Sequence, residues 1–153
     1  MSSAAEARFR VQAPNSLPRA IKVIALDQAA EAMVRQIASA GWSNTKFFTA
    51  GDRSGRGRLA DLAGHETELT GEIADADLVV LVAAPGGRAE AAGAIGQACS
   101  DRRVMTTGFI VGARGAAEVE LSKTLAQIRP WSLMVVISNH DDYISDMMIA
   151  LRA

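Results

Sequence analysis

The sequence predicts an α/β fold of the Rossmann-like kind, a three-layer sandwich built on a mostly parallel five-stranded sheet. Short apolar runs rich in Val, Ile and Leu alternate along the chain with segments whose apolar residues recur at helical spacing. Strands that alternate with helices pair in parallel through right-handed crossovers. At 153 residues the chain has the length of one domain, which we expect over residues 20–153 after a mobile arm at residues 1–19.

The first half of the chain supplies two strands and a helix between them. Residues 21–26 form an apolar run rich in β-branched side chains, which is typical of a strand. Residues 28–40 carry Ala, Met, Val and Ile at helical spacing, and Gly41 is suited to ending a helix. Then follow a strand at 46–49, a polar glycine-rich loop at 51–57, a short helical turn at 59–64 and a short helix at 68–76.

The second half begins with the most apolar strand. Residues 77–84 read DLVVLVAA, and a run that is apolar on both faces suits a central strand covered on both sides. The remaining predicted elements are a helix at 88–100, a strand at 104–111, a loop at 112–115, a helix at 117–128, a strand at 131–137 and a last helix at 141–151. A sheet of this kind binds ligands outside the carboxyl ends of its strands, near a topological switch point.

The composition narrows the function classes. Apolar residues make up 49% of the chain, aromatic residues 5%, and the net charge is −1. These values exclude a highly charged disordered chain and argue against nucleic acid as a partner. A single cysteine cannot form an internal disulfide, so we expect a reducing, cytoplasmic setting. No apolar run reaches the roughly 18 residues that a membrane span needs, so we expect no membrane partner.

The turn after residues 77–84 is the strongest candidate for a ligand site, because it reads PGGR. Gly86 and Gly87 at the start of a helix leave backbone amides to hold an anion, and Arg88 adds a contact to a phosphate or carboxylate. Asp27 and Gln28 follow the first strand at the same edge of the sheet. We predict a nucleotide- or anion-binding pocket here, with a purine nucleotide as the candidate ligand. The alternative is a plain glycine-rich turn with an exposed arginine.

Three other features have both a functional and a structural interpretation. The arginines of residues 53–58 could hold a phosphate, RNA or an acidic partner, but a solvated loop is the simpler interpretation. Residues 139–142 read NHDD and could bind a divalent metal together with Asp27, but capping of the last helix is simpler, so no metal is predicted. We expect Cys99 to be a small buried residue.

Two alternatives to a binding protein stay open. An enzyme on the same fold would use Asp27, Asp52, His140 or Asp141 as acid or base beside Gly86. The chain has only two histidines, and no Ser-His-Asp set can be assembled from them. The second alternative is an interaction module that forms a homo-oligomer through the apolar stripe of the last helix.

Two segments resemble the nucleotide-binding domain of the tubulin/FtsZ family of polymerising GTPases. IKVI at residues 21–24, with AMV at 32–34, is similar to the opening strand and helix of that family. ADLVVLVAAPGG at residues 76–87, with the strand at 104–111, resembles the strand and glycine-rich phosphate loop. Residues 47–52, FFTAGD, are similar to the second strand and an Asp-ended loop.

The resemblance implies a Rossmann-like nucleotide domain with Gly86, Gly87 and Asp52 in its pocket. The family's phosphate loop is rich in glycine and threonine, whereas this chain continues with RAEAA and brings Glu90 near the phosphates. The family's glycines after the first strand are replaced by DQA, and the chain ends before the family's central helix and second domain. The resemblance therefore implies a degenerate pocket that binds a nucleotide rather than hydrolysing it.

Overall fold

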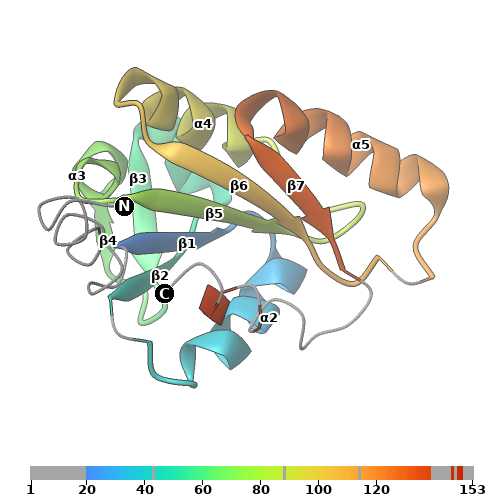
Figure 1. Cartoon of the computed structure of the whole chain (residues 1–153), viewed down its shortest axis with the longest axis horizontal. Helices are drawn as coiled ribbons and strands as arrows, with labels where there is room; N and C mark the ends of the chain where they lie inside the picture. Colours follow the sequence, from blue (N-terminus) through green and yellow to red (C-terminus); the bar gives the residue numbers. More distant parts are fainter. Residues whose placement is uncertain are drawn as a thin grey trace, which may run out of the picture.

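A seven-stranded sheet in the order β4-β3-β2-β1-β5-β6-β7 forms the centre of the fold (Figure 1). The computed structural model describes residues 20–138 except 43, 88 and 114, and also residues 146, 148 and 149; at position 52 it describes only the backbone. The five predicted strands are present and pair in parallel: β1 (Ile21–Ala25), β2 (Thr45–Thr49), β5 (Leu78–Ala83), β6 (Met105–Ile110) and β7 (Met134–Ile137). The predicted α/β class with a mostly parallel sheet is confirmed.

Helices cover both faces of the sheet (Figure 1). Alternate residues of β1 point to opposite faces, so Ile21 and Val23 join one buried apolar cluster and Ile24 joins the other. The first cluster includes α2, and the second includes α3, α4 and α5. The helices are α2 (Gln28–Ala38), α3 (Leu69–Ala74), α4 (Ala91–Asp101) and α5 (Glu118–Ile128). These two clusters make the three layers that the sequence predicts.

The predicted helical turn at 59–64 is wrong, because this segment belongs to an antiparallel hairpin that extends the sheet from five strands to seven. The hairpin consists of β3 (Arg58–Asp61) and β4 (Glu66–Glu68). Its turn is held by Asp61, whose Oδ1 accepts the backbone N–H groups of Ala63 and His65, each at 2.9 Å. Gly64 supplies the positive φ of 95° that closes the turn.

A buried ion pair fastens the hairpin and α3 to the middle of the sheet. Lys22 in β1 is only 4% exposed, and its Nζ lies 3.1 Å from Oε2 of Glu72 in α3. The other oxygen of Glu72 accepts a hydrogen bond of 3.2 Å from Thr67 in β4. A buried ammonium needs such a partner because desolvation of an unpaired charge is costly.

Other elements differ from the prediction mainly at their ends. The predicted loop at 51–57 begins with a 3-10 helix, η1 (Gly51–Arg56), and a second 3-10 turn, η2 (Arg129–Trp131), takes the start of the predicted last strand. The predicted helix at 88–100 begins at Ala91. The predicted arm at 1–19 and most of the predicted last helix lie outside the described residues, although positions 146, 148 and 149 are helical.

Candidate functional site

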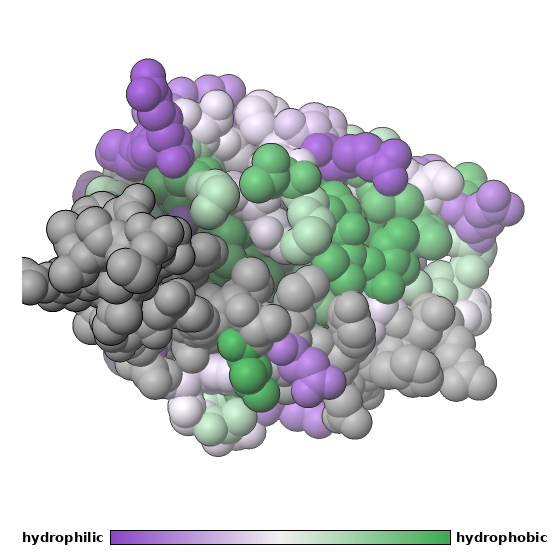
Figure 2. Space-filling view, viewed as in Figure 1, coloured by the Kyte–Doolittle hydropathy of each residue, from purple (hydrophilic) through white to green (hydrophobic). Residues whose placement is uncertain are grey.

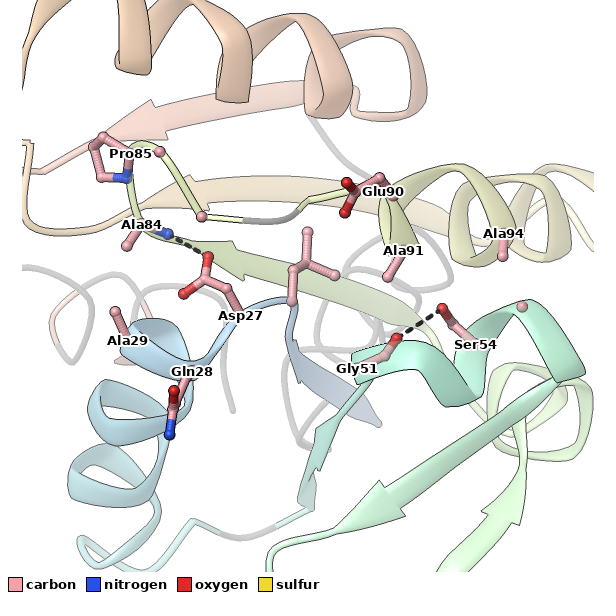
Figure 3. A pocket seen from close by; sticks show the side chains of 14 residues that line it. Asp27, Gln28, Ala29, Gly51, Ser54, Ala84, Pro85, Glu90, Ala91 and Ala94 are labelled. Atoms are coloured by element: carbon pink, nitrogen blue, oxygen red, sulfur yellow. Dashed lines mark hydrogen bonds between the residues drawn. The ribbon is translucent and has the colours of Figure 1, made fainter.

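A cavity of about 840 Å³ lies at the carboxyl edge of the sheet, between the ends of β1 and β5. The parallel strands alone follow the order 2-1-3-4-5 along the sheet, so the strand order reverses between β1 and β5. Four segments line the cavity: the turn after β1, η1, the turn after β5 and the start of α4 (Figure 3). This cavity thus coincides with the position at which doubly wound sheets bind their ligands.

Asp27 is the polar centre of this cavity. It is the N-cap of α2, and its Oδ1 accepts the backbone N–H of Ala30 at 2.8 Å. Its Oδ2 accepts the backbone N–H of Ala84, which directly follows the neighbouring strand β5, at 2.9 Å (Figure 3). One carboxylate therefore caps a helix and joins the ends of the two central strands.

The turn after β5 folds closely around carboxylates. A Cβ at Gly87 would lie 2.6 Å from Cγ of Asp27, so only glycine lets the backbone approach that side chain. Gly86 has a positive φ of 79°, and a Cβ there would lie 2.7 Å from Oε2 of Glu120. Both glycines therefore have a packing role, independent of any ligand.

The amides of this turn already have protein partners. The N–H of Gly86 donates to Oγ1 of Thr124 in α5 at 3.1 Å, and that hydroxyl donates to the carbonyl oxygen of Glu120 at 3.2 Å. The N–H of Gly87 donates to the carbonyl oxygen of Ala84 at 3.0 Å. The arrangement differs from the open anion cradle expected from PGGR, in which these amides would be free.

The described lining is acidic and made mostly of small residues. Asp27 and Glu90 are its ionisable members, and no described lysine or arginine lines it. Gln28 and Ser54 add polar groups, and Ser54 donates a long hydrogen bond of 3.4 Å to the carbonyl oxygen of Gly51. The rest of the lining is Leu26, Ala29, Gly51, Gly55, Ala84, Pro85, Gly86, Gly87, Ala91 and Ala94.

Of the residues that the sequence singles out, Asp27, Gln28, Gly86 and Gly87 meet in this cavity. The backbone of Asp52 lies in η1, whose neighbouring glycines line the same cavity, but its side chain is not among those described. The predicted contacts of Arg88, His140 and Asp141 lie outside the described residues.

Sequence reasoning missed Thr124 and Ser54. Thr124 is 1% exposed, and its role depends on the packing of α5 against the turn after β5, which no local motif reports. Ser54 is 5% exposed inside a segment that reads as polar and solvated. The polar, glycine-rich sequence around Ser54 gave no indication that this serine is buried.

The locally basic segment at 53–58 is partly neutralised by the hairpin. Arg53 Nε lies 3.5 Å and Arg56 Nη2 lies 4.0 Å from Oε1 of Glu66 in β4. Arg53 also lines a smaller cavity of about 270 Å³ beside the main one, which shares Asp27 with it. The two pairs are half-exposed, so each contributes little stability, but they lower the local positive potential.

Two other ionisable groups have shifted pKa values. Hydrogen bonds from the backbone of His65 and then of Ala63 hold the pKa of Asp61 below its usual value. Burial raises the pKa of the Cys99 thiol, against a smaller opposing effect of a hydrogen bond with Thr106. Cys99 is 1% exposed, as expected, and its thiol is the unreactive form at neutral pH.

No model of a protein family and no curated protein matches the sequence. Among solved structures, the fold is similar to an FtsZ from M. jannaschii, solved as an empty dimer, with a TM-score of 0.57 and 9% sequence identity. The match covers 96% of this chain and 57% of the FtsZ chain, so this chain spans little more than half the length of that protein. The fold is therefore tubulin/FtsZ-like, as the sequence resemblance implies. Within the described part, no helix is long and apolar enough to cross a membrane.

Proposed function

We propose that this chain, on its tubulin/FtsZ-like fold, binds a small molecule of the nucleotide class in the cavity at the carboxyl edge and does not turn it over. The observation that supports this best is the position of the cavity. It lies at the carboxyl ends of β1 and β5, where the strand order reverses, and its volume of about 840 Å³ lies within the usual range for ligand sites. The resemblance to the tubulin/FtsZ family implies a nucleotide at this same edge.

The way in which the polar groups are used supports binding without chemistry. A general base must be able to reach a proton of the ligand. Both oxygens of Asp27 accept backbone N–H groups, which makes this carboxylate a structural group first. Among the described residues, no group of three or more His, Cys, Asp or Glu side chains could hold a metal ion for hydrolysis.

Titration calorimetry with GTP, ATP, NAD, FMN and the parent nucleosides tests the proposal. We expect saturable binding of at least one of them and no product when the mixture is analysed by chromatography after long incubation. Absence of heat with all of these ligands would overturn the proposal, and product formation would replace it with the enzyme alternative.

A matched pair of variants links such binding to the cavity. Gly55 lines it, has no heavy atom within 4 Å of the position of a Cβ and has no positive φ, so we expect Gly55→Trp to occupy the cavity at little cost to the fold. Ala74→Trp places the same side chain on the exposed surface of α3. We expect binding to be lost in the first variant and unchanged in the second.

A second candidate function is self-association through β7. The observation that supports it is that β7 is an edge strand without charged residues. The other edge strand, β4, is short and carries Glu66 and Glu68. By contrast, Leu133 is 79% exposed and Met134 and Ile137 are each 44% exposed on the β7 side. Figure 2 shows an apolar patch over this strand. Uncharged exposed edges pair readily with another strand, and two copies of β7 would form a continuous sheet about a two-fold axis.

Light scattering after size-exclusion chromatography tests this candidate. We expect a dimer at concentrations of about 100 μM and a monomer for Leu133→Lys, because a charge on the edge blocks pairing. A monomer of the unmodified chain at every concentration would eliminate self-association through β7.

A further inference from the structure

We propose that a groove at the amino edge of the sheet is a docking site for an acidic segment of another protein, held by one apolar side chain. The groove has a volume of about 390 Å³ and lies at the starts of β6 and β7, at the opposite edge of the sheet from the cavity between β1 and β5. The inference is independent of the proposed function, because the groove and that cavity share no lining residue.

Two loops and the end of α4 form the groove, and every residue of these loops is described. The first loop, residues 102–104, joins α4 to β6, and the second, residues 129–133, joins α5 to β7. The N–H of Leu133 donates to the carbonyl oxygen of Thr106 at 2.8 Å, which fixes the second loop to β6. The described lining of the groove carries no charged side chain.

The groove has an aromatic wall and an apolar rim. Trp131 packs directly on α4: a Cβ at Gly96 would lie 2.5 Å from Cγ of Trp131, so glycine is needed to leave room for the ring. At the rim, Leu133 is 79% exposed and Met105 is 45% exposed. A hollow of this kind suits a large apolar side chain of a partner, which is how anchor residues bind at interfaces.

Arginines border the groove in both loops. Arg102 and Arg103 lie in the first loop, and Arg129 begins the second. All three are exposed, and none forms an ion pair with a described carboxylate. Figure 2 shows hydrophilic side chains gathered over the end of α4. The two carboxylates near these loops each accept a hydrogen bond within the fold; they are Asp77 and Asp101. The arginines therefore outnumber these carboxylates, and acidic residues beside the anchor of a partner would complement them.

The backbone of Arg103 has a conformation that arginine rarely adopts. Its φ is 57°, the only positive φ of a described residue other than glycine. This residue ends α4, because its N–H donates to the carbonyl oxygen of Ser100 and the next N–H, of Val104, donates to that of Cys99. Glycine adopts this conformation without strain and is the usual residue at such a position. The backbone therefore gains nothing from an arginine, and we assign its side chain to the binding surface.

Other occupants fit the groove less well. A second copy of the chain, bound through the same groove, would bring its own three arginines against the first set. A membrane binds apolar side chains that protrude into the lipid, whereas Trp131 lines a hollow. Self-association through β7 uses the backbone edge of that strand. Leu133 belongs to both surfaces, so the variants below leave it unchanged.

Selection of random short peptides displayed on phage against the full chain, followed by fluorescence anisotropy with the enriched peptides made synthetically, tests the proposal. We expect these peptides to combine several Asp or Glu residues with one Leu, Phe or Trp. Ser100 lines the groove from an exposed position, so Ser100→Trp should fill it and abolish binding. Ala74→Trp places the same side chain on the exposed surface of α3 and should leave binding unchanged.

Two arginine variants separate docking from a structural role. Arg129→Glu should weaken binding about tenfold, because it sets a like charge beside an acidic peptide. Lys46→Glu makes the same change in net charge at an exposed position of β2 and should have little effect. Arg103→Gly removes the side chain together with the strain, so we expect stability in urea that is equal or higher, and binding about threefold weaker.

The outcomes that overturn the proposal are distinct. Peptides that bind the unmodified chain and the Ser100→Trp variant equally well would overturn it, as would enrichment of no peptide or only of peptides without acidic residues. Unchanged affinity in both arginine variants would do the same. Sedimentation with vesicles of phosphatidylcholine and phosphatidylserine gives the membrane its own readout: binding to these vesicles without enrichment of any peptide overturns the proposal in favour of a membrane surface.

Discussion

Two glycine-rich segments meet at the carboxyl edge of the sheet, and they differ in what their glycines do. The turn after β5 contains Gly86 and Gly87, whose missing side chains make room for Glu120 and Asp27. In η1, Gly55 has no heavy atom within 4 Å of the position of a Cβ. The first segment is packed against carboxylates from distant parts of the chain, whereas Gly55 in the second is exposed.

The two segments also differ in the charged groups that they contact. The turn after β5 looks like an anion site in the sequence, but the structure fills it with an internal carboxylate. The arginines of η1 face Glu66 of the hairpin. A glycine motif therefore predicts anion binding only where its amides are left unused, and this depends on residues outside the motif.

The largest expected effect distinguishes the two kinds of glycine directly. Gly87→Ala forces a methyl group against the Asp27 side chain and should lower the free energy of unfolding by about 3 kcal/mol. Gly55→Ala should change it by less than about 0.5 kcal/mol. Urea unfolding followed by circular dichroism measures both. Equal effects in the two variants would remove the distinction between a packed and an open segment.

The second-largest expected effect tests the structural role of the Asp27 carboxylate. Asp27→Ala removes the helix cap and leaves the N–H of Ala84 without its acceptor, which should cost about 2 kcal/mol. Asp27→Ser keeps the cap and should cost clearly less in the same unfolding experiment. If the alanine variant is as stable as the unmodified chain, Asp27 does not join β1 to β5 in solution.

A smaller effect concerns the arginines of η1. Glu66→Gln should leave stability within about 0.5 kcal/mol, because the pairs are half-exposed. It should also unmask Arg53 and Arg56, so that the variant is retained more strongly on an anionic column at low salt. Asp75→Asn makes the same change in net charge elsewhere and should be retained less. Equal retention of the two variants would show that net charge alone governs the behaviour.

The smallest effect is the response of the hairpin to acid. The folded pKa of Asp61 is below its unfolded value, so this carboxylate contributes stability above the unfolded value, and the contribution is lost as the pH falls through the folded one. We therefore expect Asp61→Asn to be less stable than the unmodified chain at neutral pH and to show a smaller loss at acidic pH. Unfolding curves at several pH values measure this, and parallel losses in both proteins would contradict it.

The fold could be predicted well where burial alone determines the structure. The run at 78–83 is apolar on both faces, and it forms a central strand between β1 and β6. The hairpin was missed because β3 and β4 are short and polar at their ends. What makes them strands is the Asp61 side chain in the turn and the ion pair of Glu72 with Lys22, 50 residues away in the chain.

The candidate site could be predicted in location but not in chemistry. Strand ends place Asp27, Gln28, Gly86 and Gly87 at one edge, and the cavity brings them together. Whether the amides of the turn are free depends on Asp27, 57 residues before Ala84, and on Thr124, 38 residues after Gly86. Such pairings follow from packing in three dimensions, and no local pattern around the two glycines encodes them.

A nuclear magnetic resonance titration with inorganic pyrophosphate tests the central claim most directly. In a ¹⁵N-labelled sample, the amide resonances of Ala84, Gly86 and Gly87 report whether their N–H groups are available to an anion. If the amides are committed to Asp27, Thr124 and the carbonyl oxygen of Ala84, these three resonances should stay in place at millimolar pyrophosphate. Saturable shifts of all three would show an open phosphate site and would contradict the account.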